Sequence, residues 1–455
     1  MLRLLTALAL GSFLASPAGA QIPPELSGRW SGAAIYDGTV PRLFDLEIDV
    51  VAPDSLTTTL TQPYAGFDRF RFPFAYAPGR LDGELVGGLY GDEMRLLVDL
   101  RDQTLRGTVV SGGDTTATVF LQRVLDLPPL AVDIEDVTFR AGGDELGGSF
   151  VRPGTPGPHD VAVLVTGRGS AYGRGQMAYL AKILARGGLG AFVYDARGTA
   201  RAGGLDTLTT GADRVADLAA ALDFVSGRAD VRSVGVISNS AGGWVTPLAL
   251  DGRDDVAYWV SLVGPTTDLA EQQGLAVEAY VRLTAPGAPE AEVRAAGDYQ
   301  RRLTRLAMDD APWSAMAPLV AEAREAPWAD AVDLPDSYFD PSLGYYRSRA
   351  TYDPVGALRQ LRVPTLAVFG SEDWIVPPTP HADRLRALAA EAGNDDVTVL
   401  VLDGAEHSLG RPGATVGTGA WPERYPRLWT RAPELYPTVL DWVATRVGRE
   451  LGPGR

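Results

Sequence analysis

Apolar and polar residues alternate over much of the chain between residues 26 and 124. Residues 44–50 read FDLEIDV, with an acidic residue between successive apolar ones, and residues 94–100 read MRLLVDL. This period of two is typical of strands with one buried and one solvated face, and glycine-rich breaks supply the turns. About eight such runs predict a small antiparallel barrel or sandwich over residues 21–127. We expect its own side chains to fill the interior, with a ligand-holding barrel as the alternative.

The pattern changes after the proline pair in LDLPPL (residues 125–130), which we interpret as a linker. Apolar runs now alternate with helical stretches, which is the pattern of a mostly parallel sheet covered by helices on both faces. The pattern predicts strands within residues 161–167, 190–198, 234–237, 256–264, 363–370 and 397–404, and helices near residues 176–186, 212–226 and 438–447. We therefore expect a doubly wound α/β domain over residues 128–455.

One long interval, residues 267–361, breaks this alternation. It is helix-like but irregular, and it is rich in tryptophan, tyrosine and phenylalanine. Long insertions in a regular α/β sheet usually lie over the strand ends, where binding residues gather. The sequence therefore favours a helical cap over a substrate site, with mere decoration of the fold as the alternative.

The segment VGVISNSAGGW (residues 234–244) passes from an apolar run to a helix through a few small or polar residues. At a tight strand-to-helix turn a serine hydroxyl is pushed out of the sheet, and the residues two before and two after it must be small. Ser238 and Gly242 meet this requirement around Ser240, giving S-x-S-x-G in place of the usual G-x-S-x-G. Ser240 is therefore the candidate nucleophile.

A serine hydroxyl needs an imidazole to take its proton and an acid to orient that imidazole. The chain has only three histidines. His159 lies in a Pro/Gly loop and is expected at the surface, and His381 is expected to be a partly exposed residue near a helix start. His407 directly follows the last predicted strand, from which a loop can reach the strand ends, so it is the candidate base.

Asp373 is the candidate acid, because it follows the strand predicted over residues 363–370. Glu372 is its nearest competitor, and the acidic residues that flank His407 cannot easily turn back onto that ring. The order Ser240, Asp373, His407 is one of the known chain orders of Ser-His-Asp triads. Since all three follow predicted parallel strands, their side chains should meet at one edge of the sheet.

Nucleophilic attack on a carbonyl also needs two hydrogen-bond donors for the oxyanion. The backbone N–H of Ala241, directly after the serine, is expected to be one donor. The other is expected in the loop after residues 161–167, from Arg168 or Gly169, where glycines allow a substrate to approach the backbone. The same glycines could serve only as turn formers.

The net charge of −16 argues against a nucleic-acid surface, which needs clustered basic residues. Residues 1–20 have one basic residue, an apolar centre and a small-residue end at Ala18-Gly19-Ala20, the pattern of a cleaved secretory signal peptide. We therefore expect a secreted or periplasmic protein, and no later segment approaches the ~20 apolar residues of a membrane-spanning helix. The chain contains no cysteine, so disulfides are excluded.

The chain resembles the α/β-hydrolase superfamily, in particular secreted bacterial serine hydrolases of the serine aminopeptidase-like or dienelactone hydrolase-like type with an N-terminal β domain. The resemblance covers about residues 135–447 and rests on VTGRGS, YDARG, SNSAGGW, GSEDWIVP and GAEHSL. The chain departs from the family at Thr166-Gly167, where members usually have His-Gly, and at Ser238, where they have Gly. The resemblance implies hydrolysis of carboxylic esters without a metal or cofactor.

Three functions follow from these expectations. The leading one is a secreted serine esterase that works through an acyl-enzyme intermediate. A peptidase or amidase with the same machinery and a non-catalytic ligand-binding protein are the alternatives. The aromatic insertion suggests a small-molecule ester with an apolar acyl or aryl group, and Trp244 and Trp374 are near enough in sequence to the candidate triad to line its pocket.

Overall fold

The computed structural model describes residues 21–36, 40–62, 67–71, 74–85, 92–101, 103–111, 113–124, 132–167, 174–195, 197, 209–410, 432, 434–448 and 451. These residues form two compact units, one through residue 124 and one from residue 132 onward. The predicted signal peptide and linker lie outside the described residues.

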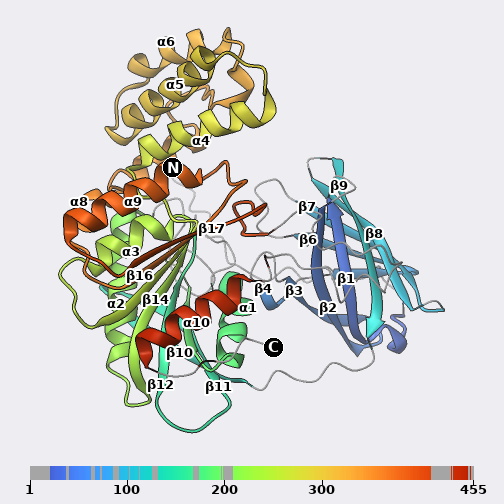
Figure 1. Ribbon diagram of the computed structural model, residues 1–455. Coiled ribbons are helices and arrows are strands. Elements are labelled where there is room, and N and C mark those ends of the chain that lie inside the picture. The colour runs from blue at the N-terminus through green and yellow to red at the C-terminus, as the bar shows by residue number, and fades with distance from the viewer. Residues whose placement is uncertain are drawn as a thin grey trace, which may run out of the picture. The chain divides into compact units, whose positions relative to one another are not determined.

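In the described part of the first unit, nine strands form one antiparallel sheet with the order β4-β3-β2-β1-β9-β8-β7-β6-β5. The strands are β1 (Gly28–Tyr36), β2 (Val40–Ala52), β3 (Ser55–Gln62), β4 (Phe67–Arg71), β5 (Phe74–Ala77), β6 (Arg80–Leu85), β7 (Asp92–Asp99), β8 (Thr104–Ser111) and β9 (Asp114–Val124), after a short 3₁₀ helix, η1 (Pro24–Leu26). Strand β3 near one edge also contacts β5 at the other edge, so the sheet curls on itself. The unit is therefore a near-barrel rather than a sandwich of two sheets (Figure 1).

The alternation in the sequence of this unit matches the two sides of its strands. Phe44, Leu46 and Ile48 are buried, as the pattern of residues 44–50 predicts. Trp30 from β1 is also fully buried, and its indole N–H donates to the Leu26 carbonyl at 3.1 Å. This pairing allows an aromatic ring with a polar atom to lie in the core.

The second unit is built on an eight-stranded sheet with the order β10-β11-β13-β12-β14-β15-β16-β17, counted over its described residues. The strands are β10 (Val132–Ala141), β11 (Asp144–Pro153), β12 (His159–Val165), β13 (Gly190–Tyr194), β14 (Val231–Asn239), β15 (Val256–Leu262), β16 (Thr365–Gly370) and β17 (Val397–Leu402). The six strands from β12 to β17 run parallel to one another. This confirms the mostly parallel sheet.

The hairpin of β10 and β11 at the edge of this sheet was not predicted. Its second strand, β11, pairs antiparallel with β13 and contains the glycine pair Gly147-Gly148. A side chain at Gly148 would lie 2.4 Å from the ring of Phe192, so the glycine is required by close packing. Because glycines have no side chains, they interrupt the alternation of apolar and polar residues from which a strand is predicted.

Helices cover both faces of the sheet. On one face lie α2 (Gly211–Ser226), α3 (Gly242–Leu250) and α9 (Pro378–Ala392), whose apolar side chains join one core cluster. On the other face α1 (Gly175–Arg186) and α10 (Leu435–Val447) contribute to a second cluster. This two-sided cover confirms the doubly wound arrangement.

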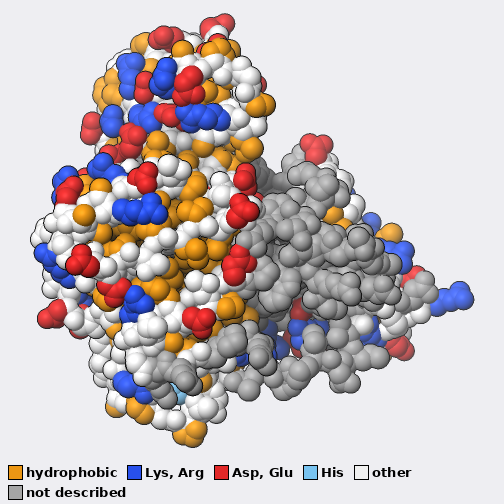
Figure 2. Space-filling model, in the orientation of Figure 1, with side chains coloured by type: hydrophobic (Ala, Val, Ile, Leu, Met, Phe, Trp, Pro, Cys, Tyr) orange, Lys and Arg blue, Asp and Glu red, His pale blue; other side chains and the backbone are white. Residues whose placement is uncertain are grey.

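The insertion between β15 and β16 is helical, as expected. It contains α4 (Leu269–Thr284), α5 (Glu290–Met308), α6 (Trp313–Arg324), η3 (Ala329–Ala331), α7 (Pro341–Ser348) and α8 (Val355–Leu358). We call the segment from α4 to α7 the cap; its first three helices stack together beyond one end of the sheet (Figure 1). Basic and acidic side chains lie side by side over these helices (Figure 2), and Arg301 of α5 pairs with Glu271 and Glu278 of α4.

Within the described part of the chain, no helix combines the length and the apolar character that crossing a membrane requires.

Candidate active site

Ser240 lies at a sharp reversal between β14 and α3. Its φ angle is +49°, a left-handed conformation that is rare and strained for a residue with a side chain. Close packing explains the small residues around it: a methyl group at Gly242 would lie 2.8 Å from the Ser238 Cβ, and one at Gly243 would lie 2.6 Å from the Gly264 Cα. The structure therefore has the strand–turn–helix geometry that the sequence predicts for a nucleophile elbow.

Ser238 has a specific partner in this turn. Its hydroxyl is fully buried and accepts a hydrogen bond from the indole N–H of Trp259 in β15 at 2.8 Å. The family's usual glycine could not accept this bond, and a buried indole without a partner costs free energy. Ser238 is thus more than a tolerated small residue, because it pairs a tryptophan of the neighbouring strand.

We expect Ser238→Ala to lower the free energy of unfolding by about 1–3 kcal/mol, because the Trp259 indole loses its acceptor while the Cβ is kept. Urea unfolding of the wild type and the variant measures this loss. Trp259→Phe provides the matched control, since in that background the serine has no indole to pair. An equal loss in both backgrounds would contradict the assigned hydrogen bond.

Ser240, His407 and Asp373 form one hydrogen-bonded relay. The His407 Nε2 lies 3.0 Å from the Ser240 Oγ, and its Nδ1 lies 2.8 Å from the Asp373 Oδ2. The three residues follow β14, β16 and β17, whose parallel directions bring these ends to one edge of the sheet. Ser240 and His407 are partly exposed, with 24% of the histidine side chain reaching solvent, whereas 0% of the Asp373 side chain does.

The Asp373 carboxylate is buried but fully engaged. Its Oδ1 accepts hydrogen bonds from the backbone N–H groups of Ile375 and Val376, both at 2.9 Å, while Oδ2 faces His407. These bonds fix the carboxylate plane and offset the cost of burying a charge. Glu372, its competitor in the sequence, is exposed, and its carboxylate accepts a hydrogen bond from the neighbouring Ser371 hydroxyl at 3.3 Å.

His381 is not the partly exposed residue predicted from the sequence. It is fully buried in α9, and its Nδ1 accepts from the backbone N–H of Thr266 at 3.1 Å. Burial lowers the pKa of His381 to about 3, so the ring is neutral at physiological pH. The prediction failed because a position near a helix start says nothing about which segment packs over it; here the residues after β15 do.

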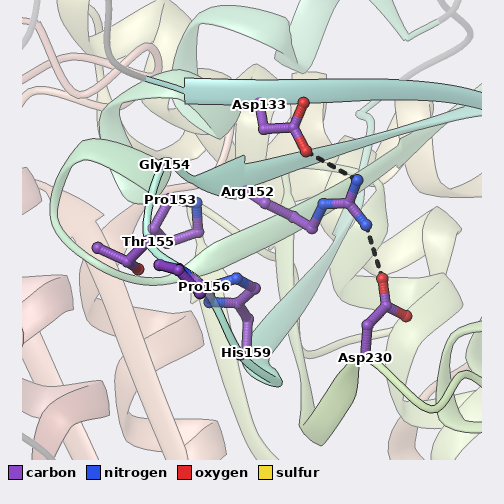
Figure 3. Close-up of a pocket in the computed structure, with 9 residues that line it drawn as sticks. Asp133, Arg152, Pro153, Gly154, Thr155, Pro156, His159 and Asp230 are labelled. Atoms are coloured by element: carbon purple, nitrogen blue, oxygen red, sulfur yellow. Dashed lines mark hydrogen bonds and ion pairs between the residues drawn. The ribbon is translucent and has the colours of Figure 1, made fainter.

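His159, predicted at the surface, is also buried, with 8% of the residue exposed. It begins β12 and lines a cavity of about 350 Å³ with neighbouring loop residues (Figure 3). Arg152 crosses this cavity between Asp133 and Asp230, at 2.9 and 2.6 Å. The cavity lies at the amino end of β12, the opposite edge from Ser240, so it is separate from the candidate active site.

Of the three residues expected to supply oxyanion donors, Ala241 lies among the described residues. Ala241 is buried directly after Ser240, and a methyl group at Gly167 would lie 3.2 Å from the Ser240 Cβ, so the end of β12 packs against the elbow. Arg168 and Gly169, the two residues predicted to supply the second donor, lie outside the described residues.

Arg214 is a residue that the sequence analysis missed. It is buried in α2, and its guanidinium donates to the Thr166 carbonyl at 2.6 Å. This bond fixes the peptide that leads into Gly167 and hence the backbone beside Ser240. The sequence did contain a sign of this role. Arg214 lies four residues before Leu218 and so on the apolar face of α2, where a charged side chain indicates a specific buried partner.

The two tryptophans assigned to a substrate pocket have different surroundings. Trp244 is 4% exposed, donates to the Thr267 carbonyl at 2.7 Å and stacks on Tyr352, so it is a core residue. Trp374 is 38% exposed, directly follows Asp373, and lies against Tyr280 of the cap with ring centroids 4.8 Å apart. Of the two tryptophans, Trp374 is the one with an exposed ring, on the residue that directly follows Asp373.

Several solved structures are similar to this chain at low identity. An esterase of Pyrococcus furiosus is 16% identical, with 63% of this chain and 88% of that chain covered and a TM-score of 0.39. Est1E of Butyrivibrio proteoclasticus with bound ferulic acid is 16% identical, with 60% and 91% covered and a TM-score of 0.39. An acylaminoacyl peptidase of Pyrococcus horikoshii is 13% identical, with 83% and 59% covered and a TM-score of 0.42.

No curated protein matches the chain. The family model described as serine aminopeptidase, S33, matches residues 156–411, which contain the elbow, the cap and all three residues of the relay. This range is more than half of the 455 residues. The chain therefore belongs to the serine aminopeptidase S33 family of α/β hydrolases.

Proposed function

We propose that the protein is an exported serine esterase that cleaves carboxylic esters through an acyl-enzyme intermediate. The observation that carries this proposal is the continuous relay from Ser240 through His407 to Asp373, with contacts of 3.0 and 2.8 Å. An imidazole held between a serine hydroxyl and a buried carboxylate is the arrangement that activates a serine nucleophile.

In the proposed reaction, the Ser240 Oγ attacks the acyl carbon while the His407 Nε2 takes the hydroxyl proton. The buried Asp373 keeps the proton of His407 on Nδ1, so that Nε2 is free to accept, and it stabilises the imidazolium that forms. The same Nε2 then protonates the leaving alcohol. A water molecule, deprotonated by His407, hydrolyses the acyl-enzyme and restores the serine.

The negative charge on the carbonyl oxygen requires donors that are already oriented. We assign one to the backbone N–H of Ala241, which follows the nucleophile at the start of α3. We assign the second to Arg168 or Gly169, in the loop that continues from Gly167. The bond from Arg214 to the Thr166 carbonyl supports this assignment, because it holds the stem of that loop against the elbow.

The proposed substrate is a small ester with an apolar acyl or aryl group. Support comes from the exposed ring of Trp374 beside Asp373 and its contact with Tyr280 of the cap. Aromatic faces next to a reactive centre bind apolar and aryl groups by burial and ring contact. Export to the periplasm or the exterior rests on the pattern of residues 1–20 alone.

A panel of aryl esters of increasing acyl length, set beside matched aminoacyl anilides, tests this function. We expect kcat/KM to be higher for the esters than for the anilides. We also expect it to rise with the length of the apolar acyl chain, because a longer chain buries more apolar area against the Trp374 ring. Clear preference for the anilides would make the protein a peptidase. Failure of a fluorophosphonate to label Ser240, together with no turnover, would make it a binding protein.

A further inference from the structure

Helix α4 of the cap contacts the loop that follows β16 at two points. The Gln272 side-chain amide donates to the Ile375 carbonyl at 2.6 Å, and two turns further along Tyr280 contacts Trp374. Residues 272 and 280 lie on the same face of the helix, since eight residues are slightly more than two turns. The segment that carries Asp373 is thus held by the cap as well as by the sheet.

The hydrogen bond from Gln272 is made to the peptide unit that also donates to Asp373. The Ile375 carbonyl and the Val376 N–H belong to the same peptide unit, and that N–H donates to the Asp373 Oδ1 at 2.9 Å. Because a peptide is planar and its C=O and N–H point in opposite directions, Gln272 and Asp373 hold it from opposite sides. A donor on the carbonyl also polarises the peptide and strengthens its N–H as a donor.

Gln272 is itself fixed in place. It is 2% exposed, and its Oε1 accepts a hydrogen bond from the side chain of Gln273. A carbonyl can only accept, so the Gln272 nitrogen must face Ile375. The side chain therefore has one orientation, in which its amide nitrogen donates to the Ile375 carbonyl, next to Asp373.

We propose that Gln272 is a positioning residue that orients the acid of the relay from the cap. The chain of contacts runs from the Gln272 amide through the Ile375–Val376 peptide to Asp373, then to His407 and Ser240. This inference rests on the proposed function of the relay and extends it, since it places part of the catalytic support outside the α/β sheet. Buried amides that support a functional side chain in this way hold its geometry and act through it.

The test is Gln272→Met, which keeps length and removes the donor. We expect kcat on an aryl ester to fall about tenfold, the rate equivalent of one hydrogen bond, with KM little changed. We also expect the downfield proton resonance of the His407 Nδ1–H to move, because that proton lies in the bond to Asp373. Gln272→Leu likewise removes the donor, and should act in the same direction if the first variant folds poorly.

Gln300→Met is the matched control. Gln300 is equally buried in α5 and donates to Asp333 at 2.9 Å and to the Tyr346 hydroxyl at 3.1 Å, so its loss also weakens the cap. We expect Gln300→Met to lower stability but to leave kcat and the resonance close to wild type. Equal loss of kcat in the Gln272 and Gln300 variants, or an unmoved resonance in both Gln272 variants, would overturn the proposal.

The resonance separates this proposal from the proposed function. It is observed in the resting protein and needs no turnover. If the wild type cleaves no ester, the esterase proposal fails, while the comparison of resonances still decides whether Gln272 orients Asp373.

Discussion

Replacing Ser240 by alanine is expected to lower kcat on an aryl ester by a factor on the order of 10⁶. The change removes the Oγ that lies 3.0 Å from the His407 Nε2 and so removes the proposed nucleophile. Alanine keeps the Cβ, so the backbone at φ +49° and the packing against Gly167 are expected to persist. Initial rates and fluorophosphonate labelling measure the loss, and thermal unfolding checks the fold.

Because Ser240 and His407 act together in the relay, we expect the losses of kcat from replacing each of them not to be additive. Once the nucleophile is gone, His407 has no proton to take, so His407→Ala in the Ser240→Ala background is expected to cost little more. His407→Ala alone should cost nearly as much as the double variant. A Ser240→Ala protein that keeps wild-type turnover, or that still reacts with the fluorophosphonate, would remove Ser240 from the mechanism.

Asp373→Asn is expected to lower kcat by about 10⁴-fold with the fold intact. The reason lies in the two backbone N–H groups of Ile375 and Val376 that donate to the Asp373 Oδ1. In the variant only the amide oxygen can accept from them, so the amide nitrogen must face His407. That nitrogen donates to Nδ1, which moves the ring proton to Nε2 and leaves it unable to accept from Ser240.

Glu372→Gln is the control for this prediction. Glu372 is the neighbouring acid, but it is exposed and lies outside the relay, so its change should leave kcat nearly as it was. Nitrogen chemical shifts of His407 report the tautomer directly and should differ between the wild type and Asp373→Asn. Full activity in Asp373→Asn together with a loss in Glu372→Gln would reassign the acid.

The meeting of Ser240, Asp373 and His407 could be predicted because it depends on strand direction. Each residue follows an apolar run, and parallel strands bring their carboxyl ends to one edge whatever the details of packing. The small residues at 238 and 242 likewise reflect a local requirement, that of a tight turn. Such features depend on short segments of sequence, so they can be predicted without knowledge of the rest of the fold.

The environments of the other two histidines could not be predicted in this way. His159 and His381 lie in segments whose local composition suggests exposure, yet both are buried. Burial depends on what packs over a segment; for His381 this includes Thr266, which is 115 residues away in the sequence. No local pattern encodes such a neighbour.

By itself, the sequence determined an antiparallel β unit, the doubly wound sheet, the helical insertion and the elbow at Ser240, because side-chain period and turn chemistry are local properties. Only the tertiary structure decided how the elbow is supported. Arg214 reaches Thr166 across 48 residues, and Gln272 reaches Ile375 across 103 residues. Each of these bonds joins a side chain to a backbone carbonyl. Because every residue has a backbone carbonyl, the sequence does not indicate which one the side chain will bind.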